Sequence, residues 1–164
     1  MNIGDEAPDF QEITHTGTEI SLREFRGKQV VVLFFYPQDG TPVCTREACG
    51  FRDAYEEFAS AGAVVIGVSR NSQQSHQRFA ANYQLPFHLL SDSSGKLRQL
   101  FEVPDTWGLI PSRVTFVIDR QGVIRHIFSA LLQGEVHVRE ALSVVRKLQE
   151  EAAGEIPADD ERTA

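Results

Sequence analysis

The chain of 164 residues contains only two cysteines, Cys44 and Cys49, and both lie in one short stretch. Pro37 and Pro42 interrupt the chain before Cys44, and apolar residues recur at intervals of three and four after it. A helix is therefore expected to begin near Cys44. Free N–H groups and the positive end of the helix dipole favour an anion there, so we expect Cys44 to react as a thiolate, with Arg46 as a nearby cation.

The spacing of the two cysteines restricts the chemistry that they can share. Four residues separate them, which argues against a Cys-x-x-Cys disulfide exchanger. On one regular helix their Cα atoms would lie roughly 8.6 Å apart, whereas a disulfide needs less than about 7 Å. A bond between Cys44 and Cys49 would therefore require the first helical turns to unwind. The other interpretation, that Cys49 is a small buried apolar residue beside Ala48, stays open.

The remaining residues give no sign of a bound metal. A zinc site would need two further ligands, and the histidines show no paired spacing with one another or with a cysteine. The five histidines are His15, His76, His88, His126 and His137. We therefore expect no metal and no other cofactor.

Length and charge limit the class of protein and its partners. A chain of this length is expected to fold with a full core that needs no disulfide or metal. The 16 basic and 23 acidic residues give a net charge of −7, which argues against nucleic acid or an anionic membrane as the main partner. Residues 1–6 have neither a basic region nor an apolar signal core, so we expect a cytoplasmic protein. In that reducing compartment a cysteine pair is more often catalytic or redox-active than structural.

The elements predicted around the cysteines form a mixed α/β sheet with helices on both faces. The first part of the chain is predicted to form a hairpin over 10–14 and 18–22, a turn over 23–28, a buried strand over 29–36 and a helix over 43–60. A strand over 63–69, a helix over 72–83, a strand over 87–91 and a short helix over 94–101 follow. The last part is predicted to be a loop over 103–111 with Trp107, a hairpin over 113–119 and 123–128, and a helix from 135 to about 151. The polar segment 153–164 is expected to be disordered.

The stretch around Cys44 resembles the active site of a known family. The pattern Pro37-x-x-x-Thr41-x-x-Cys44 is similar to the peroxiredoxin motif, and residues 48–53 resemble the peroxiredoxin Q, or bacterioferritin comigratory protein, subfamily. The resemblance continues through 113–119. It implies a thioredoxin-like fold for a domain over residues 1–152, with the tail outside it. Position 43 departs from the subfamily, which often has glycine where this chain has Val43.

The resemblance implies the reduction of hydrogen peroxide or an organic hydroperoxide, an antioxidant activity. Cys44 would be the peroxidatic thiolate that becomes a sulfenic acid. The transition state needs donors at both peroxide oxygens. Thr41 would supply a hydroxyl, Val43 and Cys44 their backbone N–H groups, and Arg113 a fixed cation. Pro37 would shape the loop and shield the site from water.

Further residues have roles that the sequence leaves less defined. By the resemblance, Cys49 would attack the sulfenic acid within the same chain, and thioredoxin or a similar dithiol would reduce the product. No partner chain is then required, so we expect a monomer. Glu47 is interpreted either as a carboxylate that orients an arginine or as an ordinary solvated one. Tyr36 is interpreted first as a core residue and second as part of the edge of the substrate pocket.

Two other function classes remain open at this point. One is a redox-regulated sensor or binding module, in which oxidation of Cys44 unfolds the helix and changes a partner surface. The other is a thioredoxin-like disulfide reductase, which would act on a protein disulfide without peroxide.

Overall fold

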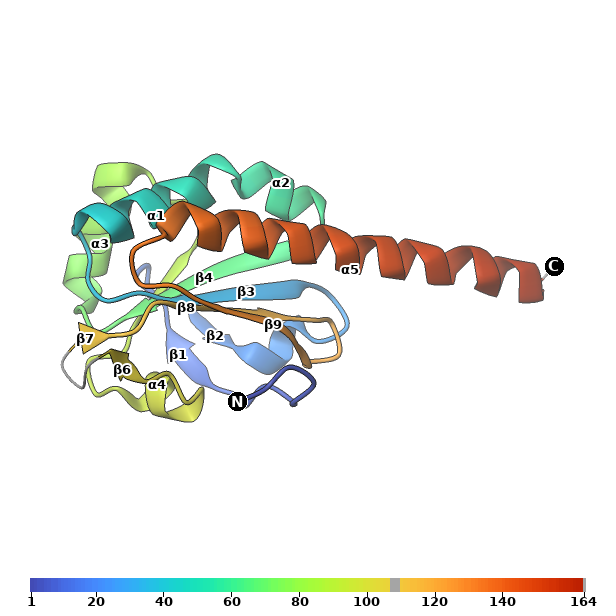
Figure 1. Ribbon diagram of the computed structural model, residues 1–164, viewed down its shortest axis with the longest axis horizontal. Coiled ribbons are helices and arrows are strands. Elements are labelled where there is room, and N and C mark those ends of the chain that lie inside the picture. Colours follow the sequence, from blue (N-terminus) through green and yellow to red (C-terminus); the bar gives the residue numbers. More distant parts are fainter. Residues whose placement is uncertain (107–109, 164) are drawn as a thin grey trace.

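A five-stranded sheet forms the centre of the molecule (Figure 1). The structure is a computed structural model, which describes residues 1–106 and 110–163. The strand order of the sheet is β5-β4-β3-β8-β9. The strands are β3 (Val30–Phe35), β4 (Ala63–Ser69), β5 (His88–Ser91), β8 (Val114–Ile118) and β9 (Ile124–Ser129). β3, β4 and β5 run parallel, whereas β8 is antiparallel to both β3 and β9. The mixed sheet predicted from the sequence is thus confirmed.

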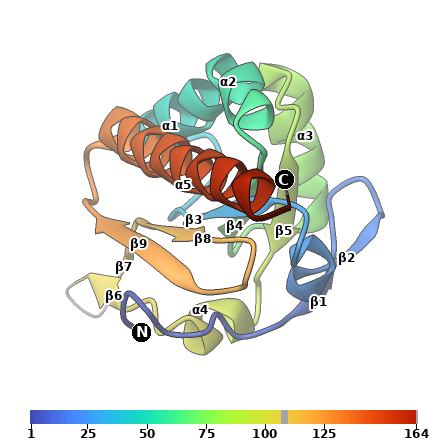
Figure 2. The same ribbon diagram turned by 90° about the vertical axis from the view of Figure 1, so that its right-hand side faces the viewer.

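The central strand β3 is buried on both faces, as its continuous apolar sequence predicts. Val32 and Phe34 face one core cluster, which also holds residues of α1 (Pro42–Asp53), α2 (Tyr55–Ser60), α3 (Gln73–Tyr83) and α5 (Gly134–Thr163). Leu33 and Phe35 face a second cluster, under the N-terminal segment and α4 (Lys96–Leu100). Figure 2 shows α5 lying across one face of the sheet and α4 on the opposite side.

The N-terminal hairpin consists of β1 (Gln11–Ile13) and β2 (Glu19–Ser21), an antiparallel pair within the predicted ranges. The following segment differs from the predicted turn over 23–28, because Leu22–Phe25 forms a 3-10 helix, η1. The Glu24 carboxylate accepts a hydrogen bond from the Ser21 N–H at 3.3 Å, which stabilises the start of this helix.

The prediction of one helix over 43–60 is wrong in one respect, because this segment forms two helices. The chain leaves helical geometry at Ala54, where α1 ends and α2 begins. Phe51 and Phe58, seven residues apart, are both fully buried with ring centroids 5.6 Å apart. Apolar spacing alone does not distinguish one continuous helix from two that bury the same face in a shared core.

The C-terminal part of the chain also differs from the prediction. Helix α5 does not end near Glu151 but continues through Thr163 (Figure 1). Residues 150–153, Glu-Glu-Ala-Ala, have high helix propensity, so the helix passes the end predicted near Glu151. The domain boundary at residue 152 and the disordered tail over 153–164 stay predictions.

The segment predicted as a loop over 103–111 contains two short paired strands, β6 (Asp105–Thr106) and β7 (Ile110–Pro111). Trp107 lies outside the described residues. No helix in the part of the chain that the structure describes is long and apolar enough to span a membrane.

Candidate active site

Cys44 lies in the first turn of α1, directly after the loop that leaves the carboxyl end of β3. Thr41 is the N-cap residue, Pro42 occupies the first helical position, and the Thr45 N–H donates to the Thr41 carbonyl at 2.8 Å. The N–H groups of Val43 and Cys44 come before that first helical hydrogen bond, so they are available to another acceptor. The expectation that Cys44 stands at a helix N-terminus is confirmed.

The Arg113 side chain reaches Cys44 from the other side of the site, from the residue just before β8. Its Nη2 donates to Cys44 Sγ at 3.2 Å, and its Nη1 donates to Glu47 Oε1 at 2.6 Å. A third donor, Nε, is bound to the Leu131 carbonyl at 2.7 Å. Burial alone would lower the pKa of Arg113, but the charges of Glu47 and Cys44 outweigh burial and raise it. Arg113 is therefore a permanently charged group, fixed at three points beside the sulfur.

Glu47 is a fully buried carboxylate one turn after Cys44, so it is not an ordinary solvated helix residue. Of its two oxygens, Oε1 accepts the hydrogen bond from Arg113, while Oε2 has no hydrogen-bond partner among the described residues. Burial raises the pKa of Glu47 to about 8, against the lowering effect of the Arg113 charge and hydrogen bond. Of the two interpretations of Glu47, this geometry favours the one in which it orients an arginine.

His137 on α5 completes the buried polar group, and sequence reasoning did not place it there. Its Nδ1 lies 3.6 Å from Glu47 Oε2 and accepts a hydrogen bond from the Thr115 hydroxyl at 2.8 Å. Its Nε2 donates to the Ala130 carbonyl at 2.8 Å, so the ring is held as one neutral tautomer. Burial lowers the pKa of His137 to about 4, and the Arg113 charge adds to this effect. The only signal in the sequence was the position of His137 beside Val138 on the apolar face of the last helix.

Gly134, the first residue of α5, is a second site residue that was not predicted from the sequence. A Cβ at this position would lie 2.8 Å from the Val43 carbonyl oxygen and 3.0 Å from Glu47 Cβ. Real Cβ atoms do not approach backbone so closely, so α5 can start against the first turn of α1 only because residue 134 has no side chain. Gly134 therefore fixes how closely the two helices meet beside Cys44.

The other residues predicted for the site lie around the same turn. The Thr41 hydroxyl donates to the Gln38 carbonyl at 3.1 Å, and the side chains of Pro37, Thr41 and Val43 are each partly exposed. Tyr36, in contrast, is buried, and its hydroxyl donates to Asp39 Oδ1 at 2.6 Å. This geometry favours the core interpretation of Tyr36.

Cys49 lies on the same helix as Cys44, and both cysteines are free. Cys44 is buried, whereas Cys49 is partly exposed. Because α1 is unbroken between them, the separation of roughly 8.6 Å expected for an ideal helix applies, and a bond between them requires unwinding of α1.

These features define a class: a thioredoxin-like protein in which a cysteine at a helix start is paired with a buried arginine. Residues 3–127 match the model of the AhpC/TSA family, and the chain belongs to that family. It is 45% identical over 147 residues to the chloroplastic peroxiredoxin Q of Sedum lineare, covering 89% of this chain and 78% of that protein.

Solved structures show the same relationship. Peroxidoxin BcpB from Mycobacterium tuberculosis superposes with a TM-score of 0.82 at 35% identity, covering 90% of this chain and 97% of that one. The bacterioferritin comigratory protein of Xanthomonas campestris, studied for alkyl peroxide reduction, superposes with a TM-score of 0.78 at 30% identity, covering 85% and 92%. The chain is a thiol-dependent peroxidase of the peroxiredoxin type, similar to peroxiredoxin Q.

Proposed function

We propose that the chain reduces hydrogen peroxide and organic hydroperoxides through a sulfenic acid on Cys44 and an intramolecular disulfide with Cys49, and that thioredoxin reduces this disulfide. The contact of Arg113 Nη2 with Cys44 Sγ at 3.2 Å carries the proposal, because a permanent cation beside the sulfur stabilises a thiolate. The alkyl peroxide reduction named for the Xanthomonas campestris relative supports the inclusion of organic hydroperoxides.

In the first step the Cys44 thiolate attacks one oxygen of the peroxide. The S–O bond forms as the O–O bond breaks, sulfur is oxidised by two electrons, and the leaving oxygen departs as water or an alcohol after taking a proton. The N–H groups of Val43 and Cys44 and the Arg113 guanidinium are the donors that stabilise the moving negative charge. The Thr41 hydroxyl joins them by turning from the Gln38 carbonyl towards the peroxide. Pro37, partly exposed beside them, limits the entry of water.

In the second step the Cys49 sulfur attacks the sulfenic acid on Cys44. The S–S bond forms and the oxygen leaves as water. Glu47 lies between the two cysteines on α1, so unwinding this part of the helix also withdraws Glu47 from Arg113. The contact between Arg113 and Glu47 therefore stabilises the reduced site, and formation of the disulfide has to break it.

In the third step an external dithiol returns both cysteines to thiols and becomes a disulfide itself. Thioredoxin is the dithiol that we propose. Because Cys44 and Cys49 belong to one chain, the cycle needs no second copy, and we propose a monomer. A cytoplasmic location is also part of the proposal, supported by two free cysteines that must be kept reduced; the word chloroplastic belongs to the names of the plant relatives.

Single-turnover peroxide consumption tests this proposal with two serine variants. Cys44→Ser should consume no peroxide, whereas Cys49→Ser should consume one equivalent and then stop with a sulfenic acid on Cys44. A wild-type chain that reacts with peroxide no faster than free cysteine would overturn the assignment of Cys44. Reduction of a protein disulfide without peroxide would indicate the disulfide reductase instead. A Cys49 thiol that stays alkylatable after one turnover would show that Cys49 is only a core residue.

A further inference from the structure

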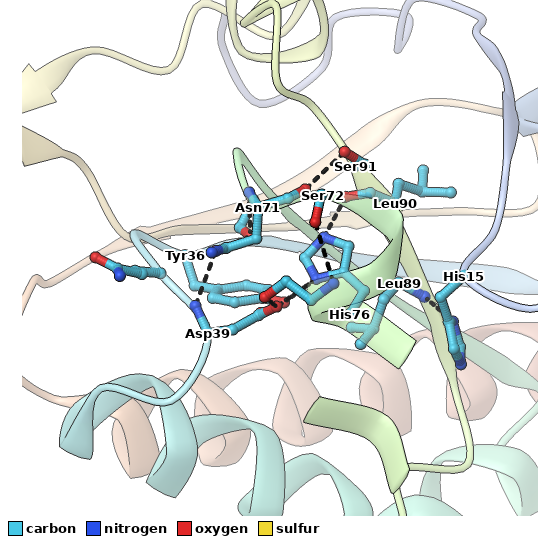
Figure 3. Close-up of polar contacts among 12 residues, drawn as sticks. His15, Tyr36, Asp39, Asn71, Ser72, His76, Leu89, Leu90 and Ser91 are labelled. Atoms are coloured by element: carbon cyan, nitrogen blue, oxygen red, sulfur yellow. Dashed lines mark hydrogen bonds and ion pairs between the residues drawn. The ribbon is translucent and has the colours of Figure 1, made fainter. Parts of the chain in front are cut away.

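A second buried polar cluster lies at the loop between β3 and α1, and the proposed chemistry does not use it (Figure 3). Its centre is Asp39, whose side chain is only 6% exposed. The carboxylate accepts hydrogen bonds from the Tyr36 hydroxyl at 2.6 Å and the Ser75 hydroxyl at 2.8 Å, and its Oδ2 lies 2.7 Å from His76 Nδ1. The Asp39 N–H donates to Asn71 Oδ1 at 2.9 Å. The loop is thus held by both its backbone and its side chain.

Both ring nitrogens of His76 have hydrogen-bonding partners. Nε2 lies 3.0 Å from the Leu90 carbonyl oxygen, which can only accept, so Nε2 carries a hydrogen. Nδ1 faces the Asp39 carboxylate, which is also an acceptor. Burial opposes ionisation of Asp39, but the hydrogen bonds from His76 and Tyr36 outweigh it, so the pKa of this carboxyl group lies below its usual value. Each ring nitrogen of His76 therefore faces an acceptor, and its Nδ1 forms a buried ion pair with the Asp39 carboxylate.

This pair connects the loop to elements other than α1. His76 belongs to α3 and is bound to Leu90 of β5, and Asn71 follows β4 and accepts a hydrogen bond from the Ser69 hydroxyl at 2.9 Å. Removing one partner of a buried ion pair is costly because it leaves an unpaired charge. Asp39 is therefore a fixed point of the chain, tied to β4, α3 and β5.

Only one residue, Gly40, lies between Asp39 and the N-cap residue of α1. Gly40 has a φ of +79°, and none of the described atoms lies within 4 Å of where its Cβ would be. Thr41 is already the N-cap of α1. The segment that has to unwind before Cys44 can reach Cys49 therefore starts immediately after the residue that the ion pair holds.

We propose that Asp39 and His76 are positioning residues that hold the upstream end of the Cys44 turn in its reactive, helical form and slow its unwinding. This inference rests on the proposed Cys44–Cys49 cycle. Its consequence concerns the fate of the sulfenic acid, which either forms the disulfide or reacts with a second peroxide. In that second reaction the peroxide transfers one oxygen to sulfur, giving a sulfinic acid and water or an alcohol. By slowing the unwinding, the ion pair increases the share of the second reaction.

The variant His76→Gln tests this inference, with His126→Gln as the matched control. His126 also contacts a carboxylate, with Nε2 3.0 Å from Glu140 Oε2, but it connects β9 to α5, away from the loop. Rapid quenching followed by intact-mass analysis separates the sulfenic, disulfide and sulfinic forms of the chain. A hydrogen bond to a charged group is worth enough to change a rate by about tenfold, so His76→Gln should form the disulfide about ten times faster. It should also need correspondingly more peroxide to reach the same fraction of sulfinic acid.

The control and a milder variant keep the test decisive. His126→Gln should keep the wild-type ratio of disulfide to sulfinic acid, whereas a merely structural role of His76 would lower the melting temperature without changing that ratio. Ser75→Ala removes one hydroxyl from the same carboxylate, and it should shift the ratio in the same direction by a smaller factor. If His76→Gln does not fold, Ser75→Ala alone decides.

Two outcomes separate this inference from the proposed cycle. If the wild type forms the Cys44–Cys49 disulfide but the folded variants form it within twofold of the wild-type rate, the positioning role is wrong and the cycle stands. If the wild type forms no such disulfide, the cycle itself fails. A change of equal size in His126→Gln would also contradict the positioning role.

Discussion

Arg113 donates one hydrogen bond to Cys44 Sγ at 3.2 Å and another to Glu47 at 2.6 Å, so a single guanidinium connects the sulfur to the middle of α1. The same group is bound to the Leu131 carbonyl through Nε. The cation is thus positioned by the loop before α5 as well as by α1. Its three donor groups, Nε, Nη1 and Nη2, point in different directions, and only a planar guanidinium group can present donors in this arrangement.

Replacing Arg113 with lysine should therefore slow the peroxide reaction even though the charge is kept. An ammonium group cannot contact Cys44, Glu47 and the Leu131 carbonyl together. We expect the second-order rate constant with hydrogen peroxide to fall by about a hundredfold, the typical effect of losing one transition-state donor. Competition kinetics measure this constant. Arg146→Lys, at an exposed pair with Glu57 on the outside of α5, is the matched control and should have little effect. An Arg113→Lys variant within threefold of the wild type would refute the role of the fork.

The hydroxyl at position 41 should matter for the same step. Thr41→Val removes the hydroxyl while keeping the shape, whereas Thr41→Ser keeps the donor. We expect the rate constant to fall about tenfold or more in Thr41→Val, because one hydrogen bond to the peroxide is lost. Thr41→Ser should stay close to the wild type. Equal rate constants for the two variants would show that the hydroxyl serves only the Gln38 carbonyl.

A methyl group at position 134 should disturb the site from the α5 side. In Gly134→Ala the new Cβ meets the Val43 carbonyl, which is backbone and cannot turn away, so α1 or α5 has to shift. We expect the free energy of unfolding to fall by about 1–3 kcal/mol, together with a slower peroxide reaction. Gly50→Ala provides the comparison, since its Cβ would meet only the Val138 side chain at 3.0 Å. Urea unfolding curves of both variants measure the difference, and equal stabilities would contradict this account of Gly134.

The stability of the protein should depend on pH through His137. Its pKa is about 4 in the folded protein and about 6.5 in an unfolded chain. The unfolded state therefore binds the proton more readily, and stability that is complete above pH 6.5 is lost as the pH falls towards 4. One pKa unit corresponds to about 1.4 kcal/mol, so the loss amounts to roughly 3 kcal/mol. His137→Gln lacks this titration. The difference in unfolding free energy between wild type and variant should thus change between pH 7 and pH 4; a constant difference would contradict the buried, neutral His137.

The start of α1 and the position of Cys44 could be predicted because their signals are local. Prolines, a buried strand and an apolar period of three to four lie within a few residues of each other. Arg113 is 69 residues from Cys44, and no spacing rule connects them. It entered only through the resemblance to peroxiredoxins. The break at Ala54 was missed because both helices bury residues on the same apolar period.

The residues that sequence reasoning missed share one property. Asp39 and His76 are 37 residues apart, and His137 meets Thr115 from another element 22 residues away. Nothing in the sequence around each of these residues indicates that the folded protein buries it. Glu47 illustrates the same limit, since its position on the helix was known while its burial was not. Burial and long-range pairing, rather than residue type, give these side chains their roles.

Hydrogen exchange of the α1 amides from Thr45 to Cys49, in the reduced and the peroxide-oxidised chain, tests the central claim most directly. The claim is that α1 has to be helical for Cys44 to react and has to unwind for Cys49 to reach it. In the oxidised wild type these amides should lose their protection, while in peroxide-treated Cys49→Ser they should keep it. A chain that contains the Cys44–Cys49 disulfide and still protects these amides as in the reduced form would contradict the account.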